Sequence, residues 1–257
     1  MSQTRRKQPE VIAAIPCFNT ELFIADVVSR AKRYVDKVIV IDDGSHDGTA
    51  DIAKATGALV INHSVNRGYG EAIKSCFEAA KTNDVDVLVI LDGDGQHNPD
   101  EIPRLLDPII EGEADLVTGS RFLHLGQFIG QDSRLLTPNS RLSTLDSRLP
   151  VMPKYRKFGI GVITFLWNFG SKVKVSDAQS GFRAYDKKIF ENSSLSEKGM
   201  SVSIETLEKA RRKRVIIKEV PVSCSYVPST LNFGAIRHGL GVALSVVRIR
   251  LKSSLHI

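Results

Sequence analysis

Residues 85–97 read V-D-V-L-V-I-L-D-G-D-G-Q-H, a mostly apolar, β-branched run that ends in two aspartates separated by one glycine. The apolar run is typical of a buried parallel strand. Gly93 and Gly95 permit a turn that would aim the carboxylates of Asp92 and Asp94 at one point. Such oxygens suit Mg²⁺ or Mn²⁺, whereas aspartates in these turns also serve as ordinary helix caps. The neighbouring motifs are needed to distinguish a metal site from a helix cap.

The segments on either side alternate between strand and helix patterns. Short β-branched runs predict strands, and apolar residues at helical spacing predict helices. The expected strands are 11–15, 37–41, 59–62, 85–91, 115–119 and 215–222, and the expected helices are 21–34, 69–81 and one that starts after Pro99. This order predicts an α/β fold with a doubly wound, mostly parallel sheet, helices on both faces, and a ligand site at the carboxyl ends of the strands.

A second acidic pair follows the strand expected at 37–41. Residues 41–49 read I-D-D-G-S-H-D-G-T, so Asp42 and Asp43 would lie on the same edge of the sheet as the first pair. A carboxylate only accepts hydrogen bonds and therefore matches the N–H and O–H donors of a nucleobase or ribose. For Ser45 and Asp47 we prefer a simpler interpretation, a cap on the next helix.

Two further loops reach this edge. Residues 16–21 read P-C-F-N-T-E after the first strand, and residues 66–70 read N-R-G-Y-G after the third. The G-x-G pattern lets the backbone approach a phosphate or ribose closely at a helix N-terminus. Four loops therefore converge on one predicted site.

Six motifs in order carry a resemblance: P-C-F-N, I-D-D-G-S-x-D-G-T, N-x-G-x-G, L-D-G-D-G-Q-H-x-P, G-S-R and D-x-x-S-G-F-R. Together they resemble the family-2 inverting glycosyltransferases of GT-A fold. More narrowly, they are similar to the dolichol-phosphate mannosyltransferases and their archaeal polyprenyl-phosphate relatives. The resemblance covers residues 11–121 and 156–226. Thr20 stands where the family usually has glutamate, and residues 124–147 form a longer acceptor loop than usual.

The resemblance implies a role for each motif. It implies nucleotide contacts from Pro16, Asn19, Asp42, Asp43, Gly68 and Asp92. It implies that Asp92, Asp94 and Gln96 surround a Mg²⁺ or Mn²⁺ ion. It implies catalytic roles for Asp94, Arg121, Asp177 and Arg183, and contacts to an acceptor phosphate from Arg121, Arg156, Ser180 and Arg183.

The nature of the acceptor determines what Asp177 does. A hydroxyl acceptor loses a proton during attack, so a carboxylate base is expected within reach. A phosphate acceptor is already an anion and needs arginines that hold two anionic partners in line. Asp177 either acts as the base or only holds its loop. The arginines after residue 120 favour the phosphate acceptor.

The leading hypothesis is inverting transfer of a hexose from a GDP-mannose or UDP-glucose type donor to a polyprenyl (dolichyl) phosphate, in glycan assembly. Transfer to a saccharide hydroxyl with Asp177 as the base is an alternative. A nucleotidyltransferase fits the G-x-G and S-G-F-R motifs poorly. A non-catalytic subunit that binds nucleotide sugars is disfavoured by the intact Asp92 and Asp94 pair.

Charge is divided unequally along the 257 residues. Residues 8–120 carry 20 acidic and nine basic side chains, and residues 121–257 carry nine acidic and 23 basic ones. Differently charged solvated faces account for this equally well, but an acidic half that gathers a cation and a basic half that meets phosphate or an anionic membrane also fit. Cys17, Cys76 and Cys224 are expected to be reduced packing residues.

We expect a basic, disordered tail at 1–10, a GT-A domain at 11–226 whose halves are 11–120 and 121–226, and a C-terminal helix within 227–257. That helix either lies on a membrane surface or packs on its own domain. No apolar run reaches about 20 residues, and no secretory signal is evident. We therefore expect a cytoplasmic protein at the cytoplasmic face of a membrane, reached directly or through a partner subunit, with no nucleic-acid partner.

Overall fold

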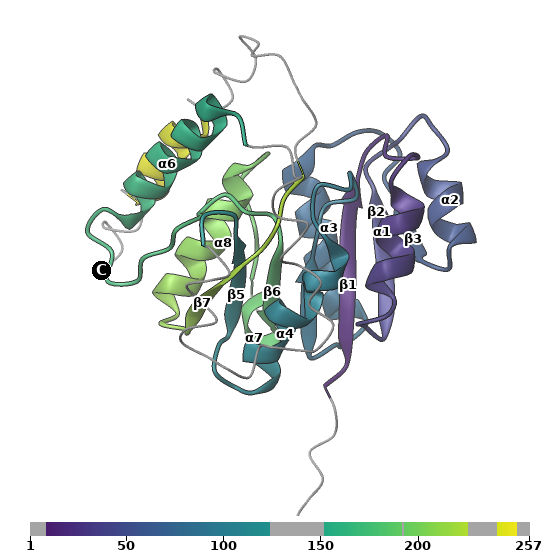
Figure 1. Cartoon of the computed structure of the whole chain (residues 1–257), viewed down its shortest axis with the longest axis horizontal. Coiled ribbons are helices and arrows are strands. Elements are labelled where there is room, and N and C mark those ends of the chain that lie inside the picture. Colours follow the sequence, from purple (N-terminus) through teal and green to yellow (C-terminus); the bar gives the residue numbers. More distant parts are fainter. Residues whose placement is uncertain (1–8, 124–151, 192, 226–240, 251–257) are drawn as a thin grey trace, which may run out of the picture.

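The computed structural model describes residues 9–123, 152–191, 193–225 and 241–250. At its centre lies one sheet made of β1 (Val11–Cys17), β2 (Lys37–Asp42), β3 (Leu59–Asn62), β4 (Val87–Ile90), β5 (Leu116–Ser120), β6 (Arg183–Asp186) and β7 (Ile217–Pro221). The spatial order is β3-β2-β1-β4-β6-β5-β7 (Figure 1). All neighbouring strands run parallel except β6, which is antiparallel to both β4 and β5. The predicted mostly parallel α/β sheet is confirmed.

Strand β6 is the strand that the sequence pattern did not predict, and helices α6 (Lys154–Asn168), α7 (Lys187–Phe190) and α8 (Ser201–Arg212) were not predicted either. It consists of four residues, R-A-Y-D, with charged residues at both ends. Its sequence shows neither a continuous apolar run nor a regular alternation of apolar and polar residues. One of its buried positions is occupied by a charged residue, Arg183, which is 1% exposed. The strand fills the gap between β4 and β5, so the D-x-x-S-G-F-R motif runs directly into the centre of the sheet.

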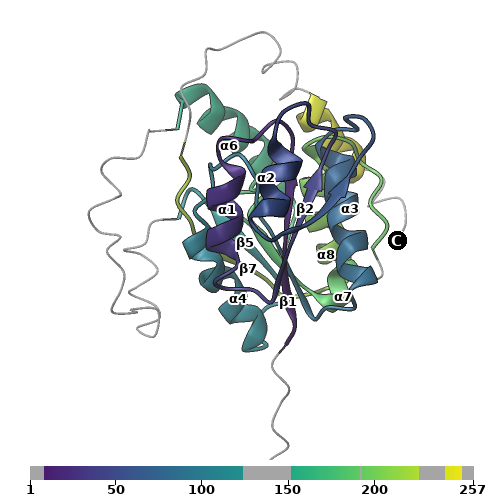
Figure 2. The same ribbon diagram turned by 90° about the vertical axis from the view of Figure 1, so that its right-hand side faces the viewer.

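Helices cover both faces of the sheet (Figure 2). They are α1 (Ile24–Ala31), α2 (Thr49–Ala55), the short η1 (Pro99–Glu101), α4 (Ile102–Ile110), α3 (Tyr69–Thr82), α6 (Lys154–Asn168), α7 (Lys187–Phe190) and α8 (Ser201–Arg212). Helices α1, α2 and α4 share one buried apolar cluster with the sheet, and α3, α6, α7 and α8 share the other. Helix α1 begins later than expected because the carbonyl of Thr20 binds the N–H groups of Phe23 and Ile24 in a turn.

Residues 241–250 form a helix beside α6. Val242, Val246 and Ile249 belong to the same buried cluster as Trp167 of α6. The guanidinium of Arg250 also donates to the carbonyl of Trp167 at 3.1 Å. One side of this helix therefore packs on the domain. Residues 226–240 and 251–257 lie outside the described part of the chain, as do the tail at 1–8 and the loop at 124–147.

Within the described ranges, no helix has both the length and the apolar character needed to cross a membrane. The cysteines Cys17, Cys76 and Cys224 are free, and the first two are buried, as expected of packing residues.

The chain that follows β7 is fixed to the loop after β4. The carboxylate of Glu101 is 1% exposed and accepts from the N–H and the hydroxyl of Ser223. Burial raises the pKa of this carboxyl to about 7, against the opposing effect of those bonds and of Arg104. The N–H of Ser225 donates to the carbonyl of Gln96 at 2.8 Å. These contacts fix the segment after β7 to the loop that carries Asp92 and Asp94, which we call the aspartate loop.

Candidate active site

The carboxyl ends of the parallel strands bring the predicted loops together. In the register of β1 with β2, Cys17 lies opposite Asp42. The carbonyl of Pro16 accepts from the N–H of Gly93 at 3.1 Å, which joins the first loop to the aspartate loop. The N–H of Asp43 donates to the carbonyl of Cys17 at 2.9 Å. Three of the predicted loops are therefore linked by backbone hydrogen bonds at one edge.

Asp43 holds the fourth loop. Its carboxylate accepts from the N–H of Gly68 at 2.7 Å, from the N–H of Arg67 at 3.0 Å, and bonds His63 Nδ1 at 2.6 Å. It is 3% exposed. Gly68 has φ +89°, a conformation that favours glycine, and directly precedes α3. Asp43 thus shapes the loop at 66–70 through two backbone hydrogen bonds, and its expected contact to a nucleoside stays a prediction.

Asn19, Asp42 and Ser45 form a connected polar corner. The hydroxyl of Ser45 donates to Asp42, and its oxygen accepts from the N–H of Asn19 at 2.9 Å. The side-chain oxygen of Asn19 accepts from the N–H of His46, also at 2.9 Å. Ser45 is therefore not a helix cap. Asp47 does meet the start of α2, since it accepts from the N–H of Thr49 at 3.0 Å.

Asp92 has the most unusual environment at this edge. Its Oδ1 is buried and has no hydrogen-bond partner among the described residues, and the same holds for the hydroxyl of Tyr69. The turn at Gly181 packs on both, because a Cβ built there would lie 2.7 Å from the Tyr69 hydroxyl and 3.0 Å from Asp92 Oδ2. Burial raises the pKa of Asp92 to about 6. The Asp92 side chain as a whole is 28% exposed, and Tyr69 and the charge of Arg121 partly oppose this rise in its pKa.

Asp94 and its neighbours complete the loop. The carboxylate of Asp94 accepts from the N–H of Gln96 at 3.0 Å and from its side-chain amide at 2.6 Å. Burial, and then the charge of Asp92, raise the pKa of Asp94. His97 is buried, which lowers its pKa, and its Nδ1 accepts from the N–H of Asp92 at 3.3 Å. Gln96 thus positions Asp94, while its role as a metal ligand stays a prediction.

This arrangement fits a divalent cation. Two like charges lie close in sequence in a partly buried loop, and one carboxylate oxygen lacks a hydrogen-bond partner among the described residues. The described residues contain no cluster of three or more His, Cys, Asp or Glu side chains that could hold a metal. Mg²⁺ commonly uses only one or two carboxylates and takes its other ligands from phosphates and water. The donor set therefore suits an ion that arrives with a nucleotide.

Arg121 and Asp177 form an ion pair beside this loop. Arg121 Nε and Nη2 donate to the two oxygens of Asp177 at 2.6 and 2.9 Å. Asp177 is fully buried and also accepts from the backbone N–H groups of Arg121 and Gln179. Both carboxylate oxygens of Asp177 accept hydrogen bonds from Arg121, so in this structure neither is available to take a proton from an acceptor. The geometry favours the interpretation in which Asp177 holds its loop.

Three predicted acceptor contacts lie elsewhere. The guanidinium of Arg183 donates to the carbonyls of Ser203 and Ala178 at 2.7 and 2.9 Å, and the side chain is 1% exposed. In this structure it points into the protein, and its contact to an acceptor phosphate stays a prediction. Ser180 is also fully buried and accepts from the N–H of Phe182 at 3.3 Å, and its contact to an acceptor phosphate stays a prediction. Arg156 is exposed on the first turn of α6.

Sequence reasoning missed Tyr69, Gly181 and His97 as contributors to the site. Each lies inside a motif that was noticed, namely N-R-G-Y-G, S-G-F-R and D-G-D-G-Q-H. Glycine at position 181 signals a close approach of the backbone, but the sequence does not show what it approaches.

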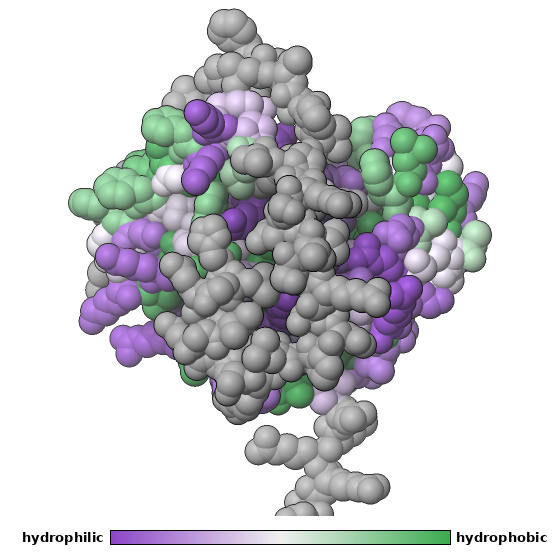
Figure 3. Space-filling model, viewed as in Figure 1, coloured by the Kyte–Doolittle hydropathy of each residue, from purple (hydrophilic) through white to green (hydrophobic). Residues whose placement is uncertain are grey.

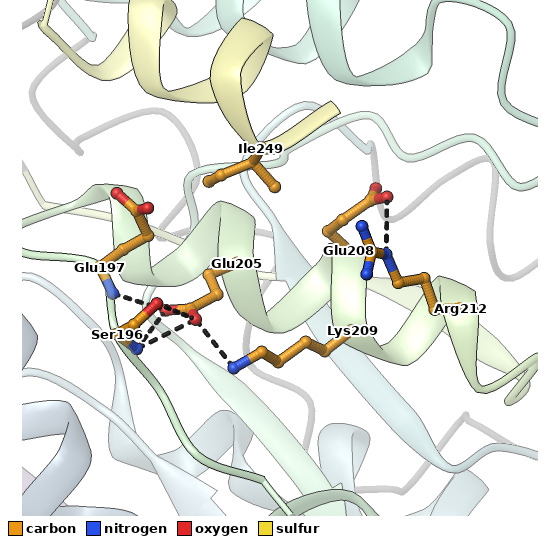
Figure 4. A pocket seen from close by; sticks show the side chains of 7 residues that line it. All are labelled: Ser196, Glu197, Glu205, Glu208, Lys209, Arg212 and Ile249. Atoms are coloured by element: carbon orange, nitrogen blue, oxygen red, sulfur yellow. Dashed lines mark hydrogen bonds and ion pairs between the residues drawn. The ribbon is translucent and has the colours of Figure 1, made fainter. Parts of the chain in front are cut away.

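A pocket of about 210 Å³ lies away from this edge, between α8 and the helix at 241–250 (Figure 4). It is lined by Ser196, Glu197, Glu205, Glu208, Lys209, Arg212 and Ile249. Glu205 pairs with Lys209 at 2.8 Å, and Glu208 lies 3.7 Å from Arg212. Its carboxylates are paired within the lining or with the neighbouring Arg211 and Arg248, and it contains none of the predicted site residues. It is therefore not the candidate active site.

Comparison with known proteins finds a family and relatives that match most of this chain. The sequence model of glycosyl transferase family 2 matches residues 12–193. The UDP-N-acetylglucosamine–dolichyl-phosphate N-acetylglucosaminyltransferase of Methanococcus voltae is 28% identical over 86% of this chain and 87% of that protein. The polyprenol monophosphomannose synthase of Mycolicibacterium smegmatis is 28% identical over 86% of this chain and 79% of that protein.

A solved structure shares the fold. Glucosyl-3-phosphoglycerate synthase from Mycobacterium tuberculosis, solved with Mn²⁺, UDP and glucosyl-3-phosphoglycerate, aligns with a TM-score of 0.62 at 20% identity. The alignment covers 95% of this chain and 79% of that one. The same synthase has also been solved with Mg²⁺ and UDP.

Proposed function

Because the chain belongs to glycosyl transferase family 2 and has the GT-A fold, we propose that it transfers a hexose from a nucleoside-diphosphate sugar to a polyprenyl phosphate. The observation that carries this proposal is the buried Arg121–Asp177 pair. It neutralises the carboxylate that a hydroxyl acceptor would need as a base. A phosphate acceptor needs no such base. The names of the relatives from Methanococcus voltae and Mycolicibacterium smegmatis point to the same class of acceptor.

The donor would lie along the carboxyl edge. Asp43 shapes the loop at Gly68, whose position before α3 suits a diphosphate at a helix N-terminus. Asp92 and Asp94 would hold Mg²⁺ or Mn²⁺. When bound, such an ion offsets the negative charge that builds on the leaving diphosphate. Asn19 and Asp42 border the same edge and would meet the nucleoside.

The acceptor would lie near Arg121. Asp177 fixes the plane of the guanidinium through two hydrogen bonds, which orders it before any ligand arrives. An ordered guanidinium is a directional phosphate ligand. In-line attack by a phosphate oxygen on the anomeric carbon breaks the bond to the diphosphate and inverts the configuration at that carbon. We place this reaction at the cytoplasmic face of a membrane, where a polyprenyl phosphate would be met.

A donor panel tests the proposal. GDP-mannose, UDP-glucose and UDP-N-acetylglucosamine are each offered with Mn²⁺ or Mg²⁺, with and without a polyprenyl phosphate. We expect lipid-linked sugar from one donor, only when the lipid phosphate is present, and none after chelation of the metal. Transfer that requires a saccharide in place of the lipid phosphate would leave the family assignment intact and overturn the proposed acceptor.

A further inference from the structure

Helix α6 is apolar on two opposite sides. Ile160, Ile163 and Trp167 face the protein and are at most 8% exposed. On the other side, Phe158 is 75% exposed and Phe165 65% exposed. A surface helix normally places polar residues opposite its buried stripe. The outer side of α6 therefore has the composition of a buried surface while it faces outward.

The exposed apolar residues follow one line along the helix. Phe158, Val162, Phe165 and Phe169 are spaced by four, three and four residues, which keeps them on one face of the helix. We call these four residues the α6 stripe. The neighbouring helix at 241–250 shows the same pattern, because Leu244 and Val247 are exposed opposite its buried residues. Figure 3 shows hydrophobic residues gathered over the part of the surface where Figure 1 draws α6.

The charges of α6 are all of one sign. Lys154, Arg156 and Lys157 occupy its first turn, and the helix contains no acidic residue. Positive charge at a helix N-terminus opposes the helix dipole, so the helix gains no stability from this placement. Lys172 and Lys174 are exposed just beyond its other end. Cations thus flank the α6 stripe at both ends.

From these observations we infer that the α6 stripe is a membrane-docking surface that inserts into the headgroup region of an anionic bilayer. An aromatic apolar face bordered by lysine and arginine is the composition of helices that lie in a membrane interface. A protein partner of mixed charge would not require a purely basic border. Helix α6 also lies toward the end of the molecule at which β1 ends (Figure 1), so docking there would bring the candidate site close to lipid. The biological role of this docking surface rests on the proposed function, whereas vesicle binding can be measured without it.

Vesicle co-sedimentation of the full chain tests the inference. The probes are vesicles of phosphatidylcholine alone, and of phosphatidylcholine with phosphatidylglycerol in equal amounts. We expect binding to the mixed vesicles that weakens with salt. The double variant Phe158→Ser/Phe165→Ser should bind at least about tenfold more weakly, because two apolar side chains no longer enter the bilayer. Lys154→Gln/Lys157→Gln should weaken binding to the mixed, anionic vesicles and leave any binding to phosphatidylcholine vesicles unchanged.

Ile216→Ser is the matched control, because Ile216 is exposed but lies directly before β7, outside the α6 stripe. It should bind as the unaltered chain does. Equal binding by the double phenylalanine variant, or no vesicle binding by the unaltered chain, would overturn the inference. Self-association that the phenylalanine changes abolish, without vesicle binding, would assign the surface to a second copy instead.

Sugar transfer to a short-chain, water-soluble polyprenyl phosphate separates this inference from the proposed function. The phenylalanine variant should retain that activity. If the chain binds vesicles but transfers no sugar to any polyprenyl phosphate, the proposed function fails and the docking surface stands. If transfer to the short-chain acceptor occurs and vesicles are not bound, the docking surface alone fails.

Discussion

Asp94→Asn should lower the rate of sugar transfer by about 1000-fold or more, because metal stabilisation of the leaving diphosphate is worth several kcal/mol. The protein should still fold. Burial and the charge of Asp92 both raise the pKa of Asp94, so removing its charge relieves a repulsion. The melting temperature should stay the same or rise. Initial rates at saturating donor, together with thermal unfolding, measure the two effects.

A second readout ties the effect to the metal. Mn²⁺ with UDP should raise the melting temperature of the unaltered chain and leave that of Asp94→Asn unchanged, because a ligand stabilises only the state that binds it. Asp51→Asn is the control, since the Asp51 side chain is 93% exposed on α2. Retention of more than about a tenth of the activity by Asp94→Asn would contradict the assigned role.

Asp177→Asn should destabilise the protein by about 3 kcal/mol, since removing one partner of a buried ion pair leaves the other charge uncompensated. Arg121 would lose the acceptor that fixes its plane, so transfer should fall as well. The pH optimum should not move, because Asp177 does not take up a proton in the proposed reaction. Urea unfolding and a pH–rate profile measure these effects.

The control for this experiment is an exposed ion pair. Glu113→Gln breaks the contact between Glu113 and Lys218, whose side chains are each about 40% exposed, and should cost at most about 1 kcal/mol. A base would behave differently. If Asp177→Asn kept full stability but lost activity together with one limb of the pH profile, Asp177 would be the base for a hydroxyl acceptor.

The sequence predicted the parts of the fold that depend on local pattern. The β-branched runs gave β1, β2 and β4, and the six ordered motifs gave a family that the comparison confirms. Strand β6 was not predicted, because its conformation depends on pairing with β4 and β5 and not on the pattern of its own four residues. The inward direction of Arg183 was not predicted either, since a motif does not show which way a side chain points.

The chemistry of the site was less predictable than its location. The sequence placed Asp92 and Asp94 at a strand end, but not the unpartnered oxygen of Asp92 beside Tyr69. It left two roles open for Asp177, and only the distances to Arg121 favour one of them. Contacts between residues so far apart in the sequence are set by packing, which a local pattern does not encode.

The central claim is that a phosphate oxygen of a lipid is the acceptor. The most direct test compares a polyprenyl phosphate with the polyprenol of the same chain length, using the donor that the panel identifies. The two acceptors share their lipid and differ only in the phosphate. The account predicts a lipid-linked sugar from the phosphate alone. Transfer of similar rate to the polyprenol would contradict it, since a hydroxyl acceptor would then be in use.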